Sequence, residues 1–248
     1  MENALRPGGW DHDQAVQAVQ LDFRLERPLG SEGKGSPGED LLRRARADDE
    51  FALDLLDWMI HNSTYFSAGF QSDDWAAELG SLLTQGGSAW EVVTVEYMSH
   101  QLTRRAVGPV VEVLEETATE ATRAHNHLSA AWSKLMGRNP DPSGAYREAI
   151  RAVEAVAKPV VLPNNDRATL GQMIAAMREK PEKWSTTLGA TDDVRAQMEA
   201  VWTGQLDRHG TDNQDAPFSV SQEEAEAAFS ICLNLVRHFV GGHVTCAE

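Results

Sequence analysis

The residues of this chain best suited to chemistry lie in one short polar stretch, GQLDRHGTDN at 204–213. Arg208 and His209 are neighbours there, between two stretches with helical patterns. An arginine can hold a phosphate through its fork of donors, and a histidine can move a proton at neutral pH. Together they could cut RNA without a metal ion, because the histidine assists the 2′-hydroxyl or the leaving oxygen while the arginine neutralises the developing charge. The alternative interpretation is a solvated turn that caps helix ends.

Three other histidines could serve a different kind of site. His125 lies in an apolar helical stripe, and His127 lies beside it on another face. A half-buried imidazole can titrate near neutrality or bind a metal, but a lone histidine is more often a core-edge residue with one satisfied hydrogen bond. A bundle that holds a metal or a small ligand would bring His100, His125 or His127 to a carboxylate on another helix.

No motif of a cofactor enzyme is present. The sequence has no P-loop, no dinucleotide fingerprint, no HExxH and no nucleophile elbow. Two cysteines, Cys232 and Cys246, cannot build a disulfide framework or a cysteine-based zinc site. We therefore expect no cofactor and no metal ligands.

Charge limits the class of partner. The chain has 248 residues and a formal net charge of −16, so phosphate backbones repel it at long range and non-specific DNA binding is not expected. The charge is uneven, because residues 1–100 carry 7 basic and 18 acidic side chains whereas residues 101–210 carry 14 of each. The neutral middle part could still present a local basic surface.

The sequence favours a cytoplasmic protein. So few cysteines suit a reducing compartment. The first thirty residues contain no continuous apolar run, and no stretch approaches the roughly eighteen apolar residues of a membrane span. Neither a signal peptide nor contact with a membrane is expected.

The fold class is predicted to be mainly α, in three parts. Residues 1–47 are expected to form a flexible acidic arm, because the segment 27–40 mixes Gly, Ser, Pro and charge. Residues 48–98 are expected to form a small, mainly helical region with one possible short strand over 86–97. Residues 99–248 predict an antiparallel helical bundle.

Five helices are expected in the bundle. A stripe of apolar residues at spacings of four and three predicts one long helix over 99–137, with a kink or a fresh start at Gly108-Pro109. Four shorter helices are expected at about 141–158, 167–179, 192–206 and 221–240.

Several residues are expected to shape these shorter helices. Thr191 is a candidate cap, and Ser221 with Glu224 predicts a capping box. Glu154 is expected to bond a neighbouring loop or helix. Gly171 is unusual within a helix, where it costs about 1 kcal/mol relative to alanine, and a close helix crossing is the simplest reason for it.

The order of these motifs resembles a known family. AYREAIRAVEAVAKP, then ATLGQMI, then an apolar helix ending in DRHG, then a final amphipathic helix, is similar to the C-terminal domain of abortive-infection proteins in the HEPN superfamily. The resemblance covers residues 125–240. It implies a helical bundle that commonly forms a homodimer. It also implies a metal-independent endoribonuclease of phage defence or toxin–antitoxin systems, acting on RNA.

The resemblance matches His209-Gly210 to the histidine end of the family's motif and implies that His209 is the acid or base. Residue chemistry adds the hypothesis that Arg208 is the phosphate clamp and that Asp207 or Gln205 is an orienting group. Active members carry an arginine that is separated from the histidine by four to six intervening residues, but the matching positions 202–204 hold Trp, Thr and Gly. This departure and the acidic net charge favour the alternative function, a catalytically inactive helical module for interaction or scaffolding.

Two other pairs satisfy the family's spacing. They are Arg237 with His243, at the end of the last expected helix, and Arg6 with His12, in the expected arm. Neither pair has the structural context of the motif, so both are interpreted as chance matches.

Overall fold

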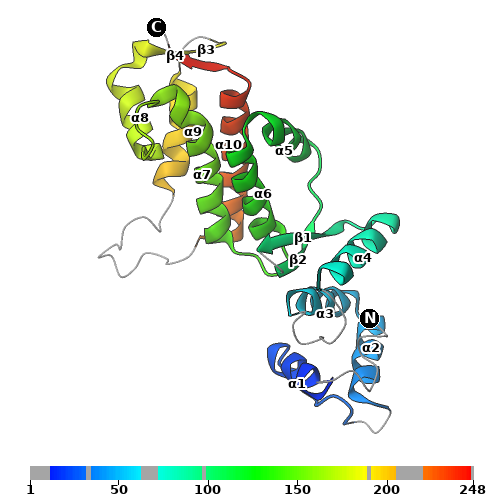
Figure 1. The fold of residues 1–248 in the computed structure, drawn as a ribbon. Helices are drawn as coiled ribbons and strands as arrows, with labels where there is room; N and C mark the ends of the chain where they lie inside the picture. Colours follow the sequence, from blue (N-terminus) through cyan, green and yellow to red (C-terminus); the bar gives the residue numbers. More distant parts are fainter. Residues whose placement is uncertain are drawn as a thin grey trace, which may run out of the picture. The chain divides into compact units, whose positions relative to one another are not determined.

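The fold is mainly helical, as predicted. The structure, a computed structural model, describes residues 12–31, 35–62, 72–96, 99–188, 191–204 and 220–246. These residues form ten α-helices and two small antiparallel sheets (Figure 1). The chain divides into two compact units, Met1–Arg105 and Ala106–Glu248.

Three helices build the core of the first unit. They are α1 (His12–Asp22), α2 (Pro37–Ala47) and α3 (Asp49–His61). Their buried apolar side chains form one cluster together with Leu29 of the turn between α1 and α2, and it includes Val16, Val19, Leu41, Leu55 and Met59. The prediction of a flexible arm over 1–47 is therefore wrong in its described part, because two helices of this segment bury apolar side chains against α3.

Asp40 ties α2 to the turn that precedes it. Its carboxylate is 5% exposed, accepts the backbone N–H of Gly30 at 3.2 Å, and pairs with Arg43 and with Arg44. Burial acts to raise the pKa of Asp40, but the hydrogen bonds from the two arginines and from Gly30 outweigh it and lower the pKa to about 2. The ionised carboxylate is thus part of the folded structure.

We expect Asp40 to make the stability of the first unit depend on acid. Its folded pKa of about 2 lies below the ordinary 3.8, so its contribution is present above about pH 4 and is lost as the pH falls to 2. The shift corresponds to about 2 kcal/mol. Urea unfolding of the full chain checks this, since Asp40→Asn should be less stable than wild type by that amount at pH 6. The free energies of unfolding of the two proteins should become nearly equal near pH 2. A difference in stability that does not change with pH contradicts the role given to the ionised Asp40 carboxylate.

A helix and a hairpin complete the first unit. After α4 (Ser72–Gln85), strand β1 (Trp90–Glu96) pairs with the antiparallel strand β2 (Ser99–Arg104), with Val92 opposite Leu102. The predicted strand over 86–97 is confirmed as β1. The prediction that residue 99 begins a long helix is wrong, because β2 occupies that segment. A buried carboxylate explains the difference, since Asp57 of α3 accepts the backbone N–H of Leu102 at 2.6 Å.

The predicted long helix is two helices in the second unit. Helix α5 (Pro109–Glu120) starts at the predicted Gly108-Pro109 break, and α6 (Thr122–Met136) follows after Ala121, which has φ −150° and ψ 62°. Side chains compete for backbone carbonyls beside this break, because Thr117 Oγ1 donates to the Val113 carbonyl at 2.7 Å and the His125 ring bonds the Leu114 carbonyl at 2.9 Å. A hydrophobic periodicity does not register such local competition.

The four shorter helices of the bundle occur close to their predicted positions. They are α7 (Pro142–Val161), α8 (Leu170–Glu179), α9 (Asp192–Thr203) and α10 (Gln222–Val240). The capping box of Ser221 and Glu224 is confirmed. Thr191 is the N-cap residue of α9, as expected, but its side chain makes no capping hydrogen bond. The side chain of Thr169 caps α8 in a second capping box.

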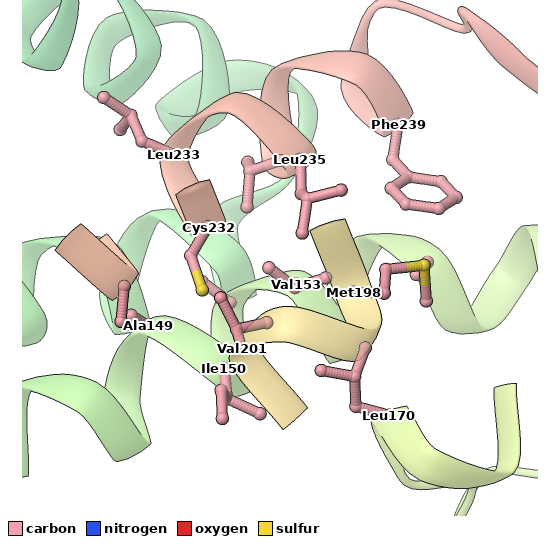
Figure 2. Packing of buried hydrophobic residues seen from close by; sticks show 14 of the residues in the cluster. Ala149, Ile150, Val153, Leu170, Met198, Val201, Cys232, Leu233, Leu235 and Phe239 are labelled. Carbon is pink, nitrogen blue, oxygen red and sulfur yellow. The ribbon is translucent and has the colours of Figure 1, made fainter. Parts of the chain in front are cut away.

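These helices share one core. Figure 2 shows side chains of α7, α8, α9 and α10 converging, among them Val153, Leu170, Met198 and Leu235. Helix α7 packs against both α6 and α10, and it runs beside them in Figure 1. The sequence did not predict the small sheet of this unit, in which β3 (Trp184–Thr186), after the 3-10 turn Pro181–Lys183, pairs with β4 (Val244–Cys246).

Candidate functional site

The predicted site residues Gln205, Asp207, Arg208 and His209 lie outside the described residues. The structure describes the two positions between which they occur, Gly204 at the end of α9 and Val220 at the start of α10. The anchoring of these two positions is therefore what the structure contributes to the predicted site.

Helix α7 holds the end of α9. The buried Tyr146 hydroxyl donates to the Val201 carbonyl at 2.8 Å. Gly204 leaves room for that hydroxyl, because a Cβ at position 204 would lie 2.7 Å from it. Two residues earlier, Trp202 lies against Gly171 of α8, where a Cβ would meet its indole ring. The close helix crossing predicted for Gly171 is confirmed.

Helix α7 also holds the start of α10. The Val220 N–H donates to Ser143 Oγ at 3.2 Å, and Val220 is buried. Gln222 then donates to the Leu135 carbonyl of α6 at 3.0 Å. Ser143 and Tyr146 both lie in the first turns of α7. The chain therefore leaves the described bundle at 204 and re-enters it at 220 at the same end of α7.

A second group of chemical residues is formed by α6 and α7. His127 Nδ1 lies 2.7 Å from Glu148 Oε2, and Arg151 donates to Glu148 Oε1 at 2.8 Å. The Glu148 side chain is 16% exposed, whereas that of His127 is 29% and that of Arg151 is 56% exposed. One partly buried carboxylate thus orients an imidazole and a guanidinium that both reach solvent.

This geometry fixes the chemistry available to His127. Because a carboxylate only accepts, Nδ1 carries a proton, and Nε2 is the nitrogen left to accept or donate. The expectation that one of the three histidines meets a carboxylate on another helix is confirmed for His127. Within the described ranges, no group of three or more His, Cys, Asp or Glu side chains could hold a metal ion.

The other two histidines have structural roles. His125 bonds the Leu114 carbonyl across the break between α5 and α6, which confirms the interpretation as a satisfied core-edge histidine. His100 is 5% exposed and bonds Thr94 across the hairpin at 3.1 Å. Glu154 is also structural, as predicted, because it accepts the Leu170 N–H at the start of α8 at 2.7 Å.

Arg237 and His243 line two different cavities of the second unit. Arg237 lies along an apolar groove of about 480 Å³ between α5, α6 and α10 and pairs with Glu112 at 3.7 Å. His243 lines a different pocket of about 620 Å³, with His238 and residues of β3 and α9. The spacing match of this pair therefore brings no shared site. Arg6 of the other pair lies outside the described residues.

Cysteine chemistry finds no support in the core. Cys232 is fully buried, and burial strongly raises the pKa of its thiol, so the reactive thiolate is disfavoured.

Of the helices in the described ranges, none is both long and apolar enough to cross a bilayer.

Sequence reasoning missed Glu148 and Arg151, although a signal for them exists. Helices α6 and α7 are antiparallel neighbours joined by a short link, and Lys134 meets Asp141 across it at 3.3 Å. Two helical turns further from the link on each helix lie His127 and Glu148. Counting the same number of residues back from Lys134 and forward from Asp141 leads to His127 and Glu148, so this contact could have been predicted.

No protein-family model, curated protein or solved structure matches this chain.

Proposed function

We propose that this protein is a defence-related or toxin-type HEPN-like protein that cuts RNA without a metal ion. In this proposal His209 is the acid or base, Arg208 binds the scissile phosphate, and Asp207 or Gln205 orients the imidazole. The resemblance of the motif order to abortive-infection proteins supports it. It also includes a homodimer formed through the bundle.

The observation that carries the proposal is the anchoring of both flanks of the polar stretch on α7. The Tyr146 hydroxyl holds the last turn of α9, and Ser143 holds the residue before α10. Catalytic groups act best when rigid elements hold the chain that bears them. These two contacts tie both ends of the polar stretch to one rigid helix.

The proposed reaction is an internal transfer of the phosphodiester. His209 accepts the proton of the 2′-hydroxyl, and that oxygen bonds to phosphorus while the bond to the 5′-oxygen of the next nucleotide breaks. The released oxygen takes up a proton, and the products are a 2′,3′-cyclic phosphate and a 5′-hydroxyl. Arg208 neutralises the charge that develops on the phosphoryl oxygens.

A cleavage assay in EDTA tests this function. We expect the wild-type protein to degrade mixed RNA and His209→Ala to lose activity at least about 100-fold, since acid–base groups contribute at this scale. His238→Ala is the matched control and should retain activity, because His238 lies in the pocket beside β3. If neither wild type nor His209→Ala degrades RNA, or both do so equally, the proposed function is wrong.

One observation favours a second candidate, an inactive interaction module. The groove between α5, α6 and α10 is apolar, with Val110, Trp132 and Phe229 in its lining, and such grooves receive partner helices. The net charge of −16 also argues against a nucleic-acid substrate. Growth arrest on overexpression that disappears with His209→Ala would contradict this second candidate.

A further inference from the structure

Basic side chains are concentrated on α6 and α7. Residues 122–161 carry six basic and three acidic side chains, whereas the whole chain carries 22 and 38. The local excess of positive charge is therefore opposite in sign to the charge of the rest of the protein. A surface with such a local excess of positive charge attracts anions.

Helix geometry brings four of these residues, together with His127, to one surface. On α6, Arg123, His127 and Lys134 are four and seven residues apart, which is the spacing of one helix face. On α7, Arg147 and Arg151 are four residues apart.

Two cross-helix pairs put the two faces on the same side of the helix pair. His127 contacts Glu148 at 2.7 Å, and Lys134 contacts Asp141 at 3.3 Å. We refer to Arg123, His127, Lys134, Arg147 and Arg151 as the α6–α7 ridge.

The acidic residues of this segment are already engaged. Both oxygens of Glu148 are bonded, one to His127 and one to Arg151. Asp141 caps α7 through the Gly144 N–H at 2.8 Å. Burial acts to raise the pKa of Asp141, but the bonds from Gly144 and Lys134 outweigh it and lower the pKa.

The third acid, Glu154, bonds the start of α8 at Leu170. Glu148 and Asp141 therefore hold ridge side chains in place, while Glu154 is bonded to the backbone at the start of α8. The four Arg and Lys side chains of the ridge outnumber the two carboxylates that pair with it, so the ridge keeps an excess of positive charge.

We propose that the α6–α7 ridge binds the phosphate backbone of single-stranded RNA. This inference rests on the proposed function and adds to it a binding surface separate from residues 205–209. The ridge extends about 16 Å from Arg123 to Lys134, at the rise of an α-helix, which spans several phosphates. Guanidinium groups match phosphate oxygens in geometry, and three of the five residues are arginines.

A binding assay with a charge-reversed ridge tests the inference. The protein is the full chain carrying His209→Ala, so that the probe, a labelled single-stranded RNA, stays intact during fluorescence anisotropy. Adding Arg123→Glu and Arg151→Glu should weaken affinity at least about 10-fold. It should also reduce the salt slope, by about 0.7 for each phosphate that the protein no longer neutralises.

A matched reversal controls for net charge. Arg167→Glu with Arg178→Glu makes the same change in charge beside and on α8, where Arg178 pairs with Glu199, and should leave affinity within about twofold. Equal loss in both double variants, or no loss in the ridge variant with an unchanged circular dichroism spectrum, overturns the inference. Competition by polyglutamate as effective as that by unlabelled RNA also overturns it, because the ridge would then bind acidic protein.

The outcomes separate this inference from the proposed function. Ridge-dependent binding without cleavage by the wild-type protein supports the ridge and contradicts the ribonuclease. Cleavage that depends on His209, together with full RNA affinity in the ridge variant, supports the ribonuclease and contradicts the ridge.

Discussion

Replacing Asp57 with alanine will destabilise the first unit by about 3 kcal/mol. The Asp57 carboxylate is 5% exposed and accepts the N–H of Leu102, itself fully buried, at 2.6 Å. A hydrogen bond to a charged group contributes about 1.5–3 kcal/mol, and leaving a buried N–H unsatisfied costs about 1–3 kcal/mol. This bond also fixes β2 on α3, so its loss should release the hairpin.

Hydrogen exchange of the full chain measures this effect unit by unit. In Asp57→Ala, amides of α3 and β2 should exchange about 100-fold faster, whereas those of α7 and α10 should be unchanged. Asp57→Asn is the control, because its amide oxygen still accepts the same bond, and it should lose less than half as much protection. Equal protection in all three proteins would show that the carboxylate does not hold the hairpin.

Replacing Gly171 with alanine will destabilise the second unit by about 2 kcal/mol, the opposite of the usual effect. Within a helix, alanine is ordinarily more stable than glycine by up to about 1 kcal/mol. At position 171, however, a Cβ would lie 2.9 Å from Trp202 Nε1 and closer still to the adjoining ring carbons. Overpacking of this kind costs about 1–3 kcal/mol because a large ring must move within a packed core.

A matched glycine and a double-mutant cycle test this prediction. Gly80 lies within α4, and a Cβ there would meet Val92 at an ordinary 3.8 Å, so Gly80→Ala should stabilise slightly. Combining Gly171→Ala with Trp202→Ala should remove most of the added cost, giving a coupling energy of at least about 1 kcal/mol in urea unfolding. Strictly additive effects would mean that the crossing tolerates the methyl group.

The parts of the fold that depend on local chemistry were predictable from sequence. The capping box at Ser221 and the breaker at Gly108-Pro109 each follow from the properties of a few adjacent residues. The glycine at 171 likewise marks a close crossing, although its partner Trp202 lies on another helix. The second strand β2 was not predictable in this way, because it depends on Asp57, 45 residues away in sequence. Helix α2 was missed because a Gly-, Ser- and Pro-rich segment precedes and overlaps its start, whereas its burial in a cluster with α1 and α3 depends on tertiary packing.

The candidate site was predictable to a lesser degree. The types of residue at 205–209 suggest their chemistry, but nothing local fixes their relative placement. His127 was considered from its position beside the apolar stripe, yet its partner Glu148 follows only once α6 and α7 are paired. The packing of α6 against α7, rather than residue type, is what brings His127, Glu148 and Arg151 into one oriented cluster.

The shared attachment of residues 204 and 220 to α7 has a consequence for how this protein can diversify. Because Tyr146 and Ser143 hold both attachment points from the same helix, the intervening fifteen positions can change in sequence or length while these contacts persist. Doubling the length of a connecting segment adds only about 0.6 kcal/mol of closure entropy. The bundle can thus keep its packed interior while the segment between residues 204 and 220 evolves new specificities.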